Sequence, residues 1–186
     1  MTSHHHRAHH RRPTGVGAPP RATGRARPPL PPGQFITALP GLLGFIPEQS
    51  FVVVAFDHDR DVLATMRHDL VISADGTVHP AVGAVFDQLG GLCARYGAAG
   101  TVIVLADDRF ADDDPIYHAV IEQAHMAFAE TGGIEAGFIV GEYTEGASWH
   151  RIWHAPRWST DNRAAIRVLR SGEEAGVLGD PHSSAT

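Results

Sequence analysis

Two six-residue segments, FVVVAF at 51–56 and TVIVLA at 101–106, constrain the fold of this chain more than any other feature. Neither segment alternates apolar and polar side chains, and this pattern is typical of a β-strand covered on both faces. A third apolar segment at 134–140 indicates a further strand. We therefore expect one sheet with these three segments at its centre and helices covering it.

Two amphipathic helices are predicted between these strands. Pro80 suits the first position of a helix, and apolar residues follow it at i, i+3 and i+4 spacing as far as Tyr96. The pair Gly90-Gly91 inside this helix suggests close packing against the sheet, and a second apolar stripe follows Pro115. The order strand, helix, strand, helix, strand predicts an α/β fold. Its sheet is expected to be mixed but mostly parallel, in a three-layer-like arrangement with right-handed crossovers.

The first part of the domain is predicted to contain an antiparallel hairpin. After the first central strand, a polar turn at 57–60 leads to a second strand at 62–67, and so short a link demands antiparallel pairing. Before the hairpin, apolar residues at helical spacing predict a short helix at 34–43, which Gly44 ends. Pro40 is expected to kink or split this helix because proline lacks a backbone N–H.

The first 33 residues differ from the rest in composition. Residues 1–33 are rich in histidine, arginine and proline and hold almost no large apolar side chain, which predicts a disordered tail. Its histidines could bind a metal loosely and its arginines could contact acidic partners; the alternatives are a plain spacer or a start codon further downstream. Residues 34–186 are long enough for a single α/β domain. Its C-terminal part, 155–186, is expected to be irregular, with a short helix at 161–169.

Charge and composition argue against several classes of protein. All fifteen basic residues are arginine, and residues 34–186 hold nine of them against twenty-one acidic residues, so nucleic-acid binding is not expected. No apolar run approaches the ~18 residues of a membrane span. No apolar segment follows the basic N-terminus as in a secretion signal. A cytoplasmic protein is predicted, and the single cysteine, Cys93, excludes an internal disulfide bond.

Three motifs resemble those of a known family. They are LPGLLGFIPEQSFVVV at 39–54, MRHDL at 66–70, and SWH at 148–150 followed by GDPHSS at 179–184. In this order they resemble the actinobacterial family called domain of unknown function 4192. The family has no established activity, so the resemblance implies an uncharacterised domain and no catalytic residue. Residues 155–173 look like an insertion relative to that pattern.

An acidic loop at 107–114 is the first candidate site. It follows a central strand, and ligands bind at the carboxyl ends of strands in open α/β sheets. Asp107 and Asp108 could hold Mg²⁺ through their carboxylates. Alternatively, Asp113 or Asp114 caps the following helix and the other acids are solvated. A phosphate-binding loop is excluded because the sequence has no lysine to complete one.

Arg67 and Asp69 form a second candidate site. They lie two residues apart and share one side of a strand that continues through them. The arginine could bind an anion while its own carboxylate holds it in place. The alternative is an ion pair that only fixes the end of the sheet.

Aromatic and histidine side chains gather at 149–158. On a helix, His150 and His154 could share a zinc ion, but on a strand they would lie ~13 Å apart. The local sequence favours a strand and offers no third ligand, so no metal site is predicted here. Trp149 is either a core residue or an aromatic platform for a ligand.

Two classes of function remain open. A non-catalytic binding or interaction module is preferred, because the sequence has no catalytic triad, metal cluster or phosphate loop; its partner would be an unknown protein or small molecule. The alternative is a small-molecule or Mg-dependent enzyme that uses Asp107, Asp108 and Arg67 at the carboxyl edge of the sheet, with an unknown cofactor. Whether these side chains line one cavity discriminates between the two.

Overall fold

The structure, a computed structural model, describes residues 30–154 and 174–180. Most of the predicted tail at 1–33 and the predicted helix at 161–169 lie outside these ranges. The elements are, in chain order, α1 (Pro32–Leu43), β1 (Ser50–Phe56), β2 (Val62–Asp69), α2 (Pro80–Arg95), β3 (Gly100–Ala106), α3 (Pro115–Ala127), a short 3-10 helix (Ala129–Thr131), β4 (Ala136–Val140), β5 (Ser148–His154) and β6 (Ala175–Val177).

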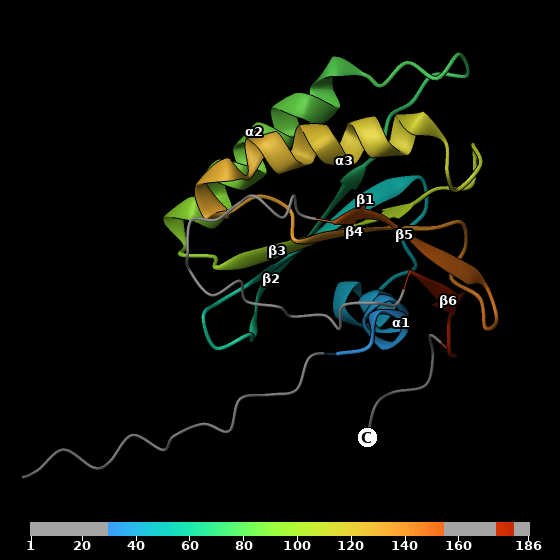
Figure 1. The fold of residues 1–186 in the computed structure, drawn as a ribbon, viewed down its shortest axis with the longest axis horizontal. Helices are drawn as coiled ribbons and strands as arrows, with labels where there is room; N and C mark the ends of the chain where they lie inside the picture. The colour runs from blue at the N-terminus through green and yellow to red at the C-terminus, as the bar shows by residue number, and fades with distance from the viewer. Residues whose placement is uncertain (1–29, 155–173, 181–186) are drawn as a thin grey trace, which may run out of the picture.

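Within the described ranges, six strands form one sheet in the order β2-β1-β3-β4-β5-β6. Helices α2 and α3 lie on one face of the sheet and α1 lies on the other (Figure 1). The core has two parts, one on each face of the sheet, and alternate side chains of β1 belong to different parts. Val52 and Val54 pack on the α1 side, and Phe51 and Val53 pack on the side of α2 and α3. The α/β class and the central position of the three apolar strands are confirmed.

The prediction of a mostly parallel sheet is wrong. β1 pairs antiparallel with β2 and β3, β5 pairs antiparallel with β4 and β6, and among the described strands only β3 and β4 pair parallel. The predicted hairpin explains the error. β2 reverses the chain before α2, so the crossover through α2 joins β2 to β3, and β1 lies between these two strands with the opposite direction.

The helix boundaries follow the predicted signals closely. α2 and α3 begin at Pro80 and Pro115, and α1 ends before Gly44, whose φ of 80° is left-handed. α1 continues through Pro40, which was expected to kink or split it. The buried apolar stripe that α1 packs against the sheet compensates for the hydrogen bond that Pro40 cannot make.

No helix in the described part of the chain is long and apolar enough to cross a membrane.

One edge of the sheet collects most of the candidate residues. Ser50, Ala106, Val140 and Trp149 are register partners, so they form a row across β1, β3, β4 and β5. Asp69, at the end of β2, pairs with Ser50 in the same row. The loops after β2, β3 and β4 therefore leave the sheet side by side, and this edge is called the carboxyl edge below.

Candidate functional site

Asp107, the first residue after β3, is buried and fully engaged by Arg109. Its two carboxylate oxygens accept hydrogen bonds from the Nε and Nη2 atoms of Arg109 at 2.8 and 2.6 Å. Arg109 also donates to the backbone oxygens of Leu70 and Ile72, at 2.6 and 3.0 Å. The pair thus fastens the loop after β2 to the end of β3, and this bidentate geometry is the strong form of an ion pair.

The electrostatics around Asp107 favour a permanent ion pair. Hydrogen bonding to Asp107, aided by the charge of that carboxylate, raises the pKa of the Arg109 guanidinium. Burial, together with the same negative charge, raises the pKa of Tyr117 on α3 to about 12. The Tyr117 oxygen in turn accepts a hydrogen bond from the backbone N–H of Phe110 at 3.3 Å. These contacts anchor the loop that follows β3.

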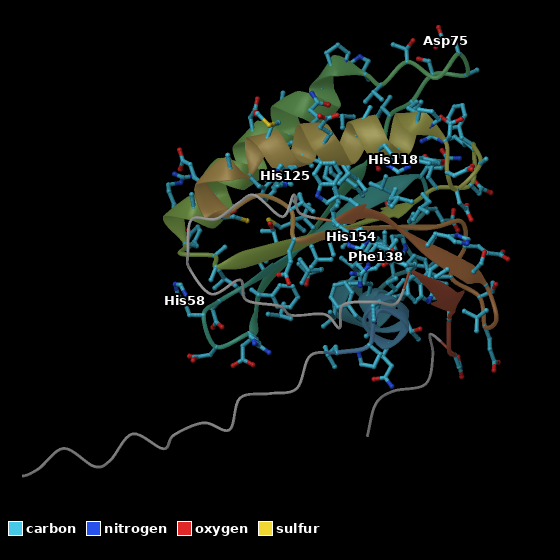
Figure 2. The ribbon with its side chains drawn as sticks, in the orientation of Figure 1. His58, Asp75, His118, His125, Phe138 and His154 are labelled. Carbon is cyan, nitrogen blue, oxygen red and sulfur yellow. The ribbon has the colours of Figure 1, made fainter. Side chains whose placement is uncertain are left out.

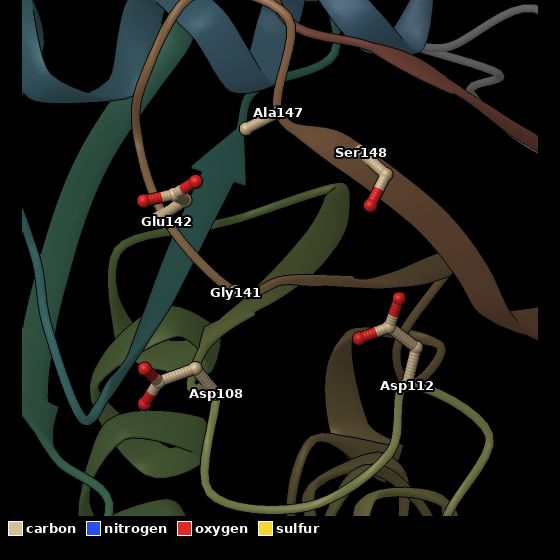
Figure 3. Close-up of a pocket in the computed structure, with 6 residues that line it drawn as sticks. All are labelled: Asp108, Asp112, Gly141, Glu142, Ala147 and Ser148. Atoms are coloured by element: carbon tan, nitrogen blue, oxygen red, sulfur yellow. The ribbon is translucent and has the colours of Figure 1, made fainter.

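Asp108 lies beside a hollow of about 280 Å³ at the carboxyl edge (Figure 3). Its lining residues come from the loop after β3, the loop after β4 and the start of β5: Asp108, Asp112, Gly141, Glu142, Ala147 and Ser148. In Figure 3 the Asp112 carboxylate points toward Ser148, whereas those of Asp108 and Glu142 point away from it. The hollow is acidic and none of these six residues is basic.

The histidines of β5 each face a separate carboxylate. His150 Nδ1 lies 2.8 Å from Asp112 Oδ2, and His154 Nε2 lies 2.9 Å from Glu174 Oε2. β5 is a strand, as predicted, so the two rings are not placed as a helical ligand pair. Figure 2 labels His154 on β5, His118 and His125 on α3, and His58 in the turn between β1 and β2. In residues 30–154 and 174–180, no three histidine, cysteine or acidic side chains are grouped so that they could hold a metal ion.

Arg67 and Asp69 face the same side of β2, as predicted, and pair at 2.5 Å. Arg67 also donates to the backbone oxygen of Glu48 at 3.2 Å. The residue after Glu48, Gln49, has a φ of 41°, which non-glycine residues rarely adopt. Its oxygen accepts from the Leu70 N–H at 2.8 Å. The pair therefore secures the loop between α1 and β1.

Trp149 belongs to the core on the α1 side. Its side chain is 2% exposed and packs edge-on against Phe138, with ring centroids 5.6 Å apart. Gly176 of β6 lies so close that a Cβ atom there would be 2.9 Å from the indole nitrogen. The five candidate residues thus share one edge, but Asp108 alone among them lines the hollow. Their role in ligand binding stays a prediction.

Large apolar side chains are exposed next to these groups. Leu42, Phe45 and Ile46, around the loop between α1 and β1, are 52%, 50% and 41% exposed. Val71, which follows β2, is 46% exposed. The hydrogen bond from Leu70 to Gln49 joins the two segments. The two segments that carry these four exposed side chains, the end of α1 with the loop after it and the residue after β2, are called the apolar loops below.

The family model described as a domain of unknown function (DUF4192) matches residues 32–186. The chain belongs to the DUF4192 family. The match begins at the first residue of α1 and confirms the resemblance to this family. No curated protein and no solved structure matches the chain.

Sequence reasoning did not anticipate most of the hollow in this DUF4192 domain. Asp112 was noted as one acid of a loop, and Glu142 and Ser148 were not singled out. Asp112 comes from the loop after β3, whereas Glu142 and Ser148 come from the loop after β4 and the start of β5; these segments meet because Val140 pairs with both Ala106 and Trp149. A correct strand order would have placed them together. The exposure of Phe45 and Ile46 had no sequence signal, because the same residues fit a buried turn.

Proposed function

We propose that this chain is a non-catalytic binding module that docks a segment of a partner protein at the carboxyl edge of its sheet. The observation that carries the proposal is the exposure of Leu42, Phe45 and Ile46 on the edge that also holds the acidic hollow. Exposed apolar groups rimmed by polar residues are typical of protein interaction sites. The left-handed Gln49 and the Arg67 contact hold this loop in one shape before any partner arrives.

The charge of the edge indicates the chemistry of the partner. Asp108, Asp112 and Glu142 surround the hollow, and its six lining residues include no basic side chain. A lysine or arginine of the partner would enter the hollow while a neighbouring apolar side chain packs on the apolar loops. Complementary charge of this kind speeds association and rejects acidic partners. The expected ligand is therefore a basic segment with one or two large apolar residues.

A selection from a random-peptide display library tests this function. We expect the enriched peptides to combine arginine or lysine with leucine or phenylalanine. Their affinity should fall at least tenfold for Phe45→Asp and also on raising the salt concentration. Val62→Asp is the matched control, because Val62 is 48% exposed but lies at the opposite end of β2. Enrichment of acidic peptides, or equal losses in both variants, would contradict the proposal.

The alternative function, a Mg-dependent or small-molecule enzyme, would draw on the same hollow through Asp108. A cation that binds only the folded state raises the melting temperature in a saturable way. We expect Mg²⁺ instead to give a small, non-saturating change that NaCl of equal ionic strength reproduces. A saturable rise in the wild type that Asp108→Asn abolishes would favour the enzyme.

A further inference from the structure

The three carboxylates that line the acidic hollow are not equivalent. Asp112 is partly buried, and its Oδ2 atom lies 2.8 Å from the Nδ1 atom of His150. Asp108 and Glu142 are exposed, and neither forms a hydrogen bond or an ion pair with any other described residue. Figure 3 shows the same division, because the Asp112 carboxylate points toward Ser148 and the other two point away from it. One carboxylate is thus engaged within the chain, and two are open to a partner.

The strand register fixes the place of His150 beside the hollow. On β5 it follows Ser148 by two residues, so the two side chains face the same side of the sheet. Its register partners are Ile139 of β4 and Ala175 of β6, and neither of these side chains carries a charge. The Nδ1 atom is buried although the side chain as a whole is 42% exposed. The ring therefore presents its buried nitrogen to Asp112 and stands on a strand that is paired on both sides.

The contact between His150 and Asp112 is a close electrostatic one. The Nδ1–Oδ2 distance is short, but the two groups lack the alignment of a hydrogen bond, which a small rotation of either side chain would supply. A neutral ring with its proton on Nδ1 can donate to the carboxylate, and a protonated ring adds a positive charge. Both forms of the ring attract the carboxylate, so Asp112 is held at this side of the hollow in either case.

We propose that His150 is a positioning residue of the acidic hollow. It holds the Asp112 carboxylate at one side, so that a basic side chain of the partner is received by Asp108 and Glu142 at the other. The inference rests on the proposed binding of a basic segment. Without the ring, Asp112 would be free to turn and to accept the same cation. His150 thus reduces the number of places where a basic side chain can bind, and this restriction contributes to specificity.

Binding of a defined peptide tests this role. The probe is a fluorescent peptide with blocked ends, in which one arginine stands between two leucines. Its affinity should fall about threefold for Asp108→Asn and for Glu142→Gln, and less than about twofold for Asp112→Asn. In a His150→Ala background, Asp112→Asn should instead cost about threefold, because the released carboxylate then contacts the peptide. An equal cost of Asp112→Asn in both backgrounds would overturn the proposal.

Two matched variants separate positioning from a general structural effect. His150→Asn keeps an N–H donor close to the position of Nδ1, so Asp112→Asn should again cost less than about twofold in that background. His154→Ala removes the neighbouring histidine of β5, which lies 2.9 Å from Glu174 and does not line the hollow. In that background Asp112→Asn should behave as in the wild type. A threefold cost in either background would contradict the specific role of His150.

A measurement without peptide tests the contact itself. The melting temperature of the variant that combines Asp112→Asn with His150→Ala should fall by about 1–2 °C less than the sum of the single changes, because both remove one interaction. Asp108→Asn combined with His150→Ala should be additive. Additive losses in the first pair would overturn the tether even where the peptide binds normally. Coupled losses without any peptide binding to the wild type would contradict the proposed function and the role of His150 in it.

Discussion

The charged side chains at the carboxyl edge mostly form ion pairs and hydrogen bonds with one another and with the backbone. Asp107 is 1% exposed and binds Arg109 through both carboxylate oxygens, and Arg109 also takes up two backbone oxygens. Arg67 divides its donors between Asp69 and the Glu48 oxygen. These side chains shape the edge by holding its loops. Asp108 and Glu142 line the hollow at this edge.

Removing Arg109 should destabilise the protein strongly. Arg109→Met leaves the buried Asp107 charge without its partner, and breaking a buried ion pair in this way costs about 3 kcal/mol. Arg67→Met is the control, because its partner Asp69 is largely exposed and such pairs contribute under about 1 kcal/mol. Urea denaturation of both variants measures the difference. Equal losses would show that Asp107 is solvated.

The raised pKa of Tyr117 predicts a loss of stability at alkaline pH. Its pKa is about 12 in the folded state against an ordinary value of 10, so the folded state holds the proton more tightly. This stabilisation is complete below pH 10 and is lost as the pH rises from 10 to 12, by up to about 2 kcal/mol. In urea denaturation at pH 8 and pH 11, Tyr117→Phe should lose less stability than the wild type. Tyr96→Phe, at a position 71% exposed, should behave like the wild type; equal losses in Tyr117→Phe would refute the assignment.

The secondary-structure elements were largely predictable from the sequence, but their directions were not. The apolar segments at 51–56 and 101–106 form β1 and β3, and Pro80 and Pro115 mark the first residues of α2 and α3. These features depend on nearby residues alone. The direction of β1 relative to β3 depends on which strand the α2 crossover leaves, and no local pattern encodes that. The hollow could not be predicted from local patterns for the same reason, because the strand order brings its residues together.

The contact between α2 and α3 distinguishes two neighbouring glycines. Gly90 and Gly91 were expected to pack against the sheet. Gly90 instead lies against α3, where a Cβ atom would collide with the Ala127 carbonyl oxygen. A Cβ atom on Gly91 would have no other heavy atom within 4 Å. Gly90→Ala should therefore cost roughly 1–3 kcal/mol because the two helices must separate. Gly91→Ala should stabilise the protein by up to about 1 kcal/mol, since alanine favours the helix. Thermal unfolding compares them, and equal effects would contradict the close approach.

On the scale of the whole molecule, the family match and the first helix begin at the same residue. α1 starts at Pro32, and its buried side chains complete the core on one face of the sheet. The sequence had placed the start of the domain at residue 34, because Pro32 and Gly33 share the composition of the preceding tail. Gly33 lies against Trp149, so α1 contacts the core from its second residue, and the extent of the domain stays a prediction.

Deleting residues 1–29 should leave the melting temperature nearly unchanged. That segment carries six arginines and almost no large apolar side chain, so it has little surface to bury. A deletion that extends through Phe35 is the comparison, because it removes a side chain that packs against Phe56, and it should lower the melting temperature markedly. A fall of several degrees in the shorter deletion would show that the basic segment binds the acidic domain.

The position of β1 between β2 and β3 has a consequence during synthesis on the ribosome. β1 can pair with β2 as soon as the hairpin emerges, but its other side needs β3, which follows only after α2. Until then β1, all of whose residues are buried in the folded protein, has a free edge, and unpaired edges of this kind promote aggregation of nascent chains. β3 is in turn completed only by β4. Nascent chains that stall before residue 100 should therefore be the form of this protein that depends most on chaperones.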